Sequence, residues 1–246
     1  RSSAASDVYK RQAVATSYSY IGQIYFAQND YSKALDYFKK SLKLDLSFFG
    51  ENHPSVASGY YNIGYVYFAQ GDYSKALEYF EEVLKIRLSV YGENHSRVAS
   101  VYNDIGEIYS VQGDDFKALD YFKKSLKIVL SVYGENHSQV SSIYDHIGEI
   151  YFAQKDYSKA LYYFEESLKI RLSLFGENHP EVALSYYSIG SLYIIQGDKS
   201  KALNYYEKSL KIRLSVYGEN HPLTKEIMDL INVANSKVLQ SPETTK

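Results

Sequence analysis

The 246-residue chain carries 27 lysine and arginine residues against 29 aspartate and glutamate residues, and it has no cysteine. The resulting net charge of −2 excludes the basic surface that draws proteins to nucleic acid or anionic membranes. The lack of cysteine excludes disulfides, thiolate catalysis and cysteine metal sites. No apolar run approaches the roughly 20 residues that span a bilayer, and no apolar signal core opens the chain, so we expect a cytoplasmic protein.

Residues 1–12 (RSSAASDVYKRQ) do not fit the pattern that follows them. We interpret them as a disordered or non-native leader and leave them out of the fold prediction. A unit of 42 residues then repeats from 13 to 220, marked by glycines at Gly22, Gly64, Gly106, Gly148 and Gly190. Self-similarity at a fixed period of this size is typical of a solenoid. The sequence therefore predicts five copies of one structural unit.

Each unit is predicted to contain two helices. In the first copy, one helical face carries the residues Val14, Tyr18, Ile21 and Tyr25. The second helix is expected from about Tyr31 to Phe48, with Asp30 as its N-cap. Gly22 lies inside the first helix, where glycine costs about 1 kcal/mol relative to alanine. We therefore expect the second helix to approach Gly22 closely, with Ala34 as the small residue opposite.

The last part of the chain is predicted to cap the array. Residues 221–240 read as one helix whose apolar face carries Ile227, Leu230, Ile231 and Ala234. Such a helix would cover the exposed end of the fifth unit. Residues 241–246 form a polar tail. The fold class that follows is all-α, with five helix–turn–helix units and a C-terminal capping helix.

The repeated residues resemble a known family. In the second copy they are Tyr60, Ile63, Gly64, Tyr67, Ala76 and Phe80. This pattern resembles the tetratricopeptide repeat, whose common period is about 34 residues. The longer unit, which closes with Gly-Glu-Asn-His, looks like the repeats of kinesin light chains. The resemblance implies a right-handed α-solenoid with a concave groove for peptides or partner helices, and it implies that asparagines such as Asn62 and Asn103 hold a peptide backbone.

The copies differ along a second stripe of the first helix, and we predict that this stripe binds a partner. The predicted groove residues are Tyr61, Asn62, Tyr65, Phe68, Asn103, Asp104, Glu107, Asp145, Glu149, Phe152 and Tyr187. The second copy contributes aromatic residues, and the third and fourth contribute acidic ones. A partner with basic residues near one end and an apolar anchor near the other would suit both. The alternative is that these positions are solvated and bind nothing.

No catalytic chemistry is predicted. The chain has no Walker motif, no Rossmann glycine fingerprint and no nucleophile elbow. Five histidines occupy one loop position per unit, where we expect them to cap helices or pack the loop: His53, His95, His137, His179 and His221. The sixth, His146, has acidic neighbours but no further ligand or nucleophile. We therefore predict no metal site, no cofactor and no enzymatic activity.

The expected function is that of a monomeric protein–protein interaction scaffold that binds a peptide or helical segment, without nucleic acid or membrane partners. Two alternatives remain open: a kinesin-light-chain-like cargo adaptor, which a heptad coiled coil upstream would indicate, and the regulatory repeat array of a larger signalling enzyme. Self-association by end-on stacking is a third interpretation, which the capping helix disfavours.

Overall fold

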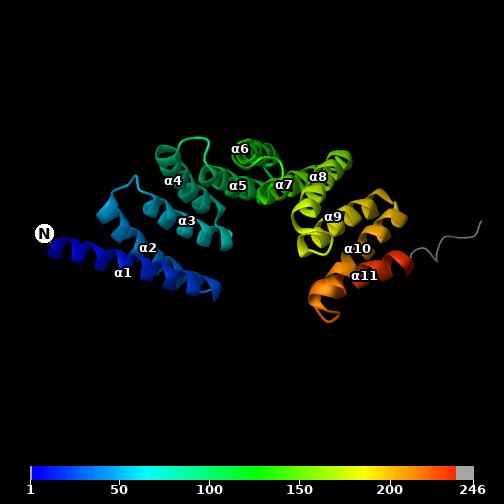
Figure 1. Cartoon of the computed structure of the whole chain (residues 1–246), viewed down its shortest axis with the longest axis horizontal. Coiled ribbons are helices and arrows are strands. Elements are labelled where there is room, and N and C mark those ends of the chain that lie inside the picture. Colours follow the sequence, from blue (N-terminus) through cyan, green and yellow to red (C-terminus); the bar gives the residue numbers. More distant parts are fainter. Residues whose placement is uncertain (1, 237–246) are drawn as a thin grey trace, which may run out of the picture. The chain divides into compact units, whose positions relative to one another are not determined.

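The structure is a computed structural model that describes the backbone of residues 2–236 and the side chains of residues 12–235. Over this range the prediction of an all-α fold is confirmed (Figure 1). The helices are α1 (Ser2–Ala27), α2 (Tyr31–Phe49), α3 (Pro54–Ala69), α4 (Tyr73–Tyr91), α5 (Ser96–Val111), α6 (Asp115–Tyr133), α7 (Ser138–Ala153), α8 (Tyr157–Phe175), α9 (Pro180–Gln196), α10 (Lys199–Tyr217) and α11 (Pro222–Ser236). We call the odd-numbered helices α1 to α9 the A helices and the even-numbered ones the B helices.

Two compact units make up the chain. The first, Arg1–Val132, contains α1 to α5 and all of α6 except its last residue. The second, Tyr133–Lys246, contains α7 to α11. The first unit thus holds repeats one to three, and the second holds repeats four and five together with the final helix.

The B helices begin at aspartates, as predicted. The Oδ1 atom of Asp30 accepts a hydrogen bond from the backbone N–H of Lys33 at 3.2 Å, which satisfies one of the free donors of the first turn. The same bond recurs at Asp72, Asp114, Asp156 and Asp198. The residue immediately before each capping aspartate has a positive φ. In chain order these residues are Asn29, Gly71, Gly113, Lys155 and Gly197.

The loop histidines cap α3, α5, α7, α9 and α11, which confirms one of the two roles expected for them. His53 Nδ1 accepts a hydrogen bond from the backbone N–H of Ser55 at 3.1 Å. The imidazole ring also stacks on the ring of Phe49 at a centroid distance of 4.0 Å, so the end of one helix is tied to the start of the next. The same pair of contacts recurs at His95, His137, His179 and His221.

The glycine that recurs in each A helix approaches the B helix closely, but the residue opposite is aromatic. A Cβ atom added to Gly22 would lie 2.7 Å from the ring of Phe38. Ala34 is fully buried, yet it is not among the atoms closest to the Cβ position of Gly22. The predicted close approach is correct and the predicted partner is wrong, because the ring lies one turn further along the B helix than the alanine.

The predicted apolar stripe forms the core of each unit. Val56 and Ile63 in the first unit, and Val182 and Ile189 in the second, have no exposed surface. Val14 occupies the corresponding place in α1 and is 43% exposed. This difference follows from its position, since no helix precedes α1 in the part of the chain that the structure describes. The first repeat therefore presents an apolar face that the later repeats bury.

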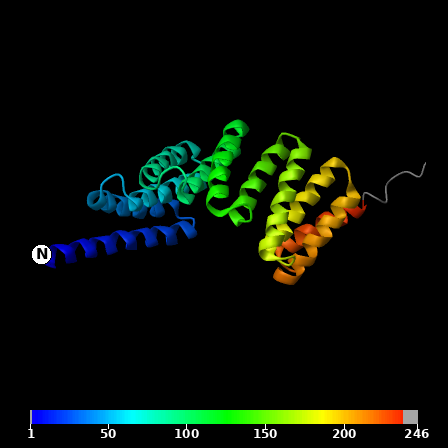
Figure 2. The same cartoon turned by 45° about the horizontal axis from the view of Figure 1, so that its top comes forward.

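The two ends differ from the expectation in their bounds. Helix α1 begins at Ser2, so its helical backbone includes residues 2–12, which had been left out of the fold prediction. No proline or glycine interrupts this stretch, which leaves the helix without a stop signal. Figures 1 and 2 both show α1 as one unbroken helix. The interpretation of residues 1–12 as non-native stays a prediction.

Helix α11 lies along α10 in both views (Figures 1 and 2). It buries Thr224, Ile227 and Ala234, which is the arrangement expected of a capping helix. The predicted end of this helix at residues 237–240 and the polar tail at residues 241–246 lie outside the described residues.

Candidate functional site

A pocket in the first unit brings five of the predicted groove residues together. It has a volume of about 330 Å³ and opens between helices α1, α3 and α5. Its lining consists of Gln23, Phe26, Phe38, Tyr61, Asn62, Tyr65, Asp104 and Glu107. We call it the aromatic–acidic pocket. The predicted stripe passes through Gln23 and Phe26 of α1 as well as the residues of α3 and α5, and Phe38 of α2 adds to the lining.

Aromatic rings form one wall of the aromatic–acidic pocket. Tyr65 is 43% exposed, and its ring centroid lies 5.6 Å from that of Phe26 and 6.2 Å from that of Tyr61. Phe68 lies 6.1 Å from Tyr65 at the edge of this wall and packs on Tyr73. Rings at these distances hold one another in place, so the exposed face of Tyr65 is presented rigidly.

Acidic residues form the other wall. The Tyr61 hydroxyl donates to the Asp104 carboxylate, and burial together with the charge of Asp104 raises the pKa of Tyr61. Glu107 accepts a hydrogen bond from the Asn103 side chain at 2.6 Å. Asn62, by contrast, donates to Ser19 Oγ over a long 3.4 Å. The asparagine pair that the resemblance assigns to a peptide backbone thus has local partners in this structure.

In the second unit, Asp145 serves a partner from its own chain. Its Oδ2 atom lies 2.7 Å from Nη2 of Arg171, whose side chain is only 5% exposed. The same guanidinium also pairs with Glu181 at 2.9 Å and donates to Ser185 Oγ at 2.8 Å. Burial raises the pKa of Asp145 and the charge of Arg171 opposes this shift. Asp145 therefore neutralises a buried cation, a role that the sequence alone did not reveal.

The other predicted residues of the second unit are less enclosed. The Glu149 side chain is 68% exposed and lies 3.8 Å from the His146 imidazole. Phe152 is half-buried, with its ring edge-on to Tyr157. The Tyr187 hydroxyl donates to Glu226 on α11 at 3.1 Å. Their role in binding stays a prediction.

The sequence family follows from a profile comparison. The profile of the tetratricopeptide repeat matches residues 13–89, 55–131, 97–173 and 139–215, with each match starting 42 residues after the last. Together these matches cover most of the chain. The chain belongs to the tetratricopeptide repeat family. Such repeats generally form protein–protein interaction scaffolds without enzymatic activity. The comparison with curated proteins gave no match.

Solved tetratricopeptide structures share this fold. BtubC (BKLC) from P. vanneervenii has a TM-score of 0.77 at 24% identity, over 90% of this chain and 88% of that one. A Podosopora anserina protein described as a kinesin light chain with nearly identical repeats has a TM-score of 0.70 at 16% identity, over 84% and 98%. A Rap protein complexed with Competence and Sporulation Factor has a TM-score of 0.64 at 18% identity, over 89% and 64%. These solved structures confirm a fold of the kinesin-light-chain-like type.

One feature of the tetratricopeptide B helices was missed at the level of sequence. Arg87, Arg171 and Arg213 occupy the same place in their repeats and are all buried. Their spacing by multiples of the period was the available signal. Each faces a residue at one place on the A helix: Arg87 lies over the Tyr61 ring at 5.2 Å, Arg171 meets Asp145, and Arg213 lies over the Tyr187 ring at 5.0 Å. The variable A-helix stripe is therefore partly an internal arginine site.

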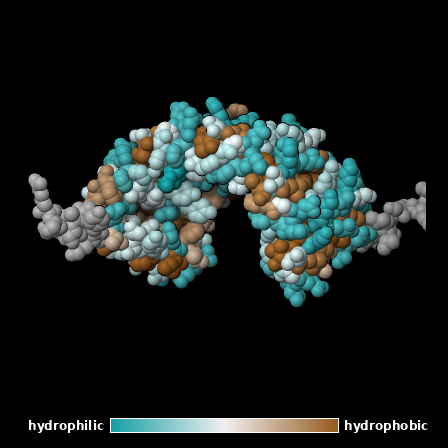
Figure 3. Space-filling model, viewed as in Figure 1, coloured by the Kyte–Doolittle hydropathy of each residue, from teal (hydrophilic) through white to brown (hydrophobic). Residues whose placement is uncertain are grey.

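Among the residues that the structure describes, no group of three histidine, aspartate or glutamate side chains is arranged to hold a metal ion. None of the described helices is long and apolar enough to cross a membrane. On the face drawn in Figure 3, exposed apolar side chains form separate brown areas among teal polar ones.

Proposed function

We propose that this tetratricopeptide array binds a segment of a partner protein, and that the aromatic–acidic pocket of the first unit is its main contact. The observation that supports the proposal is the exposed ring of Tyr65 held between Phe26, Tyr61 and Phe68, opposite two carboxylates. Rigid aromatic residues beside a partly enclosed pocket are the common anchors of protein interfaces.

The chemistry of the pocket favours a partner segment with two features. An apolar side chain would cover the Tyr65 ring and remove its apolar surface from water, which is worth about 25 cal/mol per Å². A lysine or arginine close to it would face Asp104 and Glu107. The charge pair would add to the association rate and to the choice of partner more than to the affinity. The Rap protein, whose structure is a complex with Competence and Sporulation Factor, provides a precedent for ligand binding by this fold.

The test is a capture experiment with the full chain followed by measured affinities. Proteins retained from cell extract would be identified, and peptides tiled along the best candidate would be titrated by fluorescence anisotropy. We expect Tyr65→Ala to weaken binding by more than about tenfold, since aromatic anchors commonly contribute 2 kcal/mol or more. Glu107→Lys should weaken a basic peptide and leave its neutral analogue unchanged.

Phe116→Ala is the matched control. Phe116 is 84% exposed on α6 and does not line the pocket, so its loss should change neither affinity nor stability. If Tyr65→Ala binds the peptide as tightly as the parent does, the assignment of the aromatic–acidic pocket is wrong.

We also propose a cytoplasmic location, in keeping with the absence of cysteine, and a monomeric state, in keeping with the capping helix α11. The cargo-adaptor alternative is supported by the likeness to the Podosopora anserina protein. It predicts that the captured partner is a kinesin heavy chain or its cargo. The regulatory-array alternative predicts instead that the repeats belong to a polypeptide with a catalytic domain, which sequencing of the complete transcript would test.

A further inference from the structure

The buried arginines of the B helices show how this array holds a guanidinium group. Arg87 Nη1 donates to the backbone carbonyl of Arg97 at 2.7 Å and to Ser100 Oγ at 3.0 Å, both in the first turns of the next A helix. Arg213 Nη1 makes the corresponding bond to the carbonyl of Leu223 at 2.6 Å. The first turn of the following helix therefore accepts guanidinium N–H groups at this place in the repeat.

The two repeats without this arginine carry other residues there. From repeat one to repeat five, the B-helix position of this arginine is occupied by Asp45, Arg87, Val129, Arg171 and Arg213. The A-helix position that faces it is occupied, in the same order, by Ser19, Tyr61, Asn103, Asp145 and Tyr187. An arginine always faces a ring or a carboxylate, which can stack on it or neutralise it. Repeats one and three face a small uncharged side chain instead. In repeat one the charge is reversed, since Asp45 stands where repeats two, four and five have an arginine.

Asp45 is a buried acid without a hydrogen-bonded partner among residues 12–235, whose side chains the structure describes, and the nearby His53 imidazole interacts with it only electrostatically. It is 9% exposed, and no hydrogen bond or ion pair joins its carboxylate to any side chain that the structure describes. Burial raises the pKa of Asp45 and the His53 imidazole opposes this shift without cancelling it, so ionisation is disfavoured at this place. A buried carboxylate without a hydrogen-bonded counter-ion is costly, so a cation that reached it would be bound favourably.

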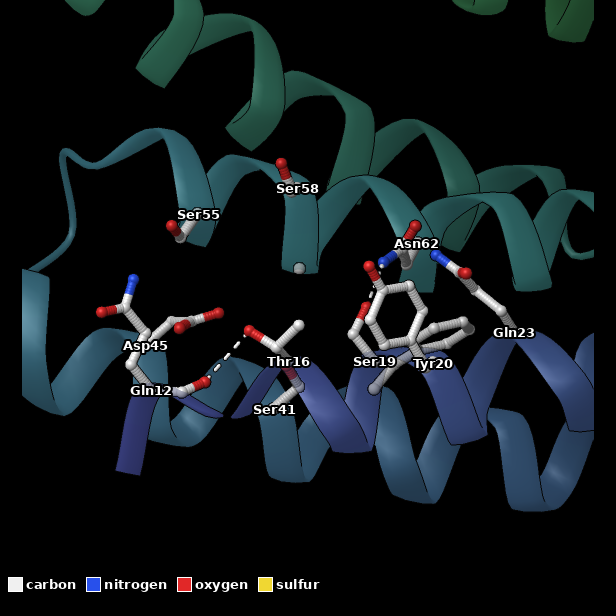
Figure 4. Close-up of a pocket in the computed structure, with 12 residues that line it drawn as sticks. Gln12, Thr16, Ser19, Tyr20, Gln23, Ser41, Asp45, Ser55, Ser58 and Asn62 are labelled. Carbon is white, nitrogen blue, oxygen red and sulfur yellow. Dashed lines mark hydrogen bonds between the residues drawn. The ribbon is translucent and has the colours of Figure 1, made fainter. Parts of the chain in front are cut away.

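A pocket leads to Asp45. It has a volume of about 260 Å³ and lies between α1, α2 and α3, and Figure 4 shows Asp45 at the end that also holds Gln12 and Ser55. Ser55 and Ser58, which also line it, correspond to Arg97 and Ser100 of the Arg87 site. Ser58 Oγ donates to the carbonyl of Pro54 at 3.0 Å, whereas Ser100 Oγ donates to that of Arg97 at 3.0 Å, so each hydroxyl uses its proton on its own helix and keeps its oxygen free to accept.

We propose that this pocket binds the guanidinium group of an arginine side chain presented by a partner polypeptide. Asp45 is the counter-ion, and the carbonyl of Ser55 and the hydroxyl of Ser58 accept further N–H groups, as their counterparts do for Arg87. The partner's arginine thus takes the place that an internal arginine takes in repeats two, four and five. The inference rests on the proposed polypeptide-binding function for the source of the arginine, and it deepens that function by naming a residue of the partner.

Size and chemistry favour this occupant over others. Pockets for drug-sized ligands usually measure about 300–1,000 Å³, so a smaller polar pocket suits one side chain. The single carboxylate offers too few charged ligands for a metal ion, and no metal-binding group was found among the described residues. Tyr20, which is 62% exposed, lines the pocket beside Ser19 and Asn62 (Figure 4), and its ring can stack on a planar cation. This pocket also shares Gln23, Phe38 and Asn62 with the aromatic–acidic pocket, so one partner segment can occupy both.

The experiment titrates the full chain with a capped arginine (acetyl-arginine-methylamide) and follows backbone amide signals by NMR. Capped citrulline, which has nearly the same shape and no charge, is the matched probe. We expect saturable shifts at Ser55, Ser58 and Asn62 with arginine and none with citrulline. Asp45→Asn should weaken arginine binding by at least about tenfold, because hydrogen bonds between charged groups are among the stronger ones.

Asp36→Asn is the control variant. Asp36 lies on the same helix, is exposed and pairs with Lys40, so its loss changes the net charge equally and should leave arginine binding intact. Asp45→Arg provides a second test: it should place an arginine as in repeats two, four and five, raise the thermal midpoint and abolish probe binding. Equal arginine affinities for the parent and Asp45→Asn, or no saturable shift in the parent, would overturn the inference.

The same variants separate this inference from the proposed function. A partner peptide that loses affinity with Tyr65→Ala and keeps it with Asp45→Asn supports the aromatic–acidic pocket and contradicts the arginine pocket. Capped-arginine binding that depends on Asp45, in a chain whose Tyr65→Ala variant retains its partner, supports the arginine pocket and contradicts the proposed main contact.

Discussion

At the scale of single residues, the absence of one methyl group decides how closely each pair of helices packs. A Cβ atom on Gly148 would lie 2.7 Å from the ring of Phe164, and one on Gly64 would lie 3.1 Å from Tyr79 Cβ and 3.3 Å from Phe80. The first distance forces a buried ring to move, whereas the second requires a shift of a few tenths of an ångström. The same residue type therefore carries different constraints in different repeats.

Alanine substitutions should separate these two cases. Alanine gains about 1 kcal/mol over glycine in a helix, and overpacking a close-packed site costs about 1–3 kcal/mol. We expect Gly148→Ala to lower the free energy of unfolding and Gly64→Ala to leave it nearly unchanged, as measured by urea denaturation followed by circular dichroism. Equal stabilities of the two variants would show that the ring of Phe164 adjusts at no cost.

At the scale of elements, helix α11 completes the second unit through a few buried side chains. Ile227 has no exposed surface, whereas Val233 on the same helix is 52% exposed. The helix also supplies the Leu223 carbonyl to Arg213 at 2.6 Å, and Glu226 lies 3.5 Å from the same guanidinium. The capping helix thus covers both an apolar surface and a buried cation.

Shortening the buried side chain should therefore destabilise the cap. Ile227→Ala is expected to lower the free energy of unfolding by about 2–5 kcal/mol, because the site loses apolar contact and keeps a cavity. Val233→Ala, on the exposed side of the helix, should change it by less than about 0.5 kcal/mol. Thermal unfolding of the two variants checks this, and similar midpoints would contradict the role of α11 as a cap.

At the scale of the whole molecule, the repeats fill the same pair of facing positions, one on the B helix and one on the A helix, with different residues. Repeat four places Arg171 opposite Asp145, whereas repeat three has Val129 opposite Asn103 at the same places. The stability of a repeat array is the sum of the stabilities of its similar units and of the interfaces between neighbours. A pair of facing residues that is stable in one repeat should therefore be stable in another. The chain therefore supplies its own matched controls.

Arg171→Val should leave Asp145 buried without its main counter-ion and cost about 3–5 kcal/mol near neutral pH. Burial already raises the pKa of Asp145 above its ordinary value of 3.8, and losing Arg171 raises it further. The carboxyl group then takes up a proton in the folded state before it does so in the unfolded chain. The loss of stability should consequently shrink as pH falls through the raised pKa, and be smallest below the ordinary value.

The double variant Arg171→Val with Asp145→Asn copies repeat three and should recover most of the stability at neutral pH. Urea denaturation of the parent, the single variant and the double variant across a pH series measures all three. A single variant whose deficit does not depend on pH would mean that Asp145 is not the group that bears the cost.

Local patterns in the sequence determined the five repeats, the two helices of each, the aspartate and histidine caps and the apolar stripe. Those features depend on residues close together in the chain, so period and capping residues predict them directly. The tertiary structure decided which helix faces meet: Phe38 lies opposite Gly22, Arg171 lies beside Asp145, and Asp45 lies at the end of a pocket with no hydrogen bond to a described side chain. These contacts join residues on different helices. The repeat pattern does not encode the direction or the burial of a side chain, and these two properties determine whether an acidic residue is solvated or paired.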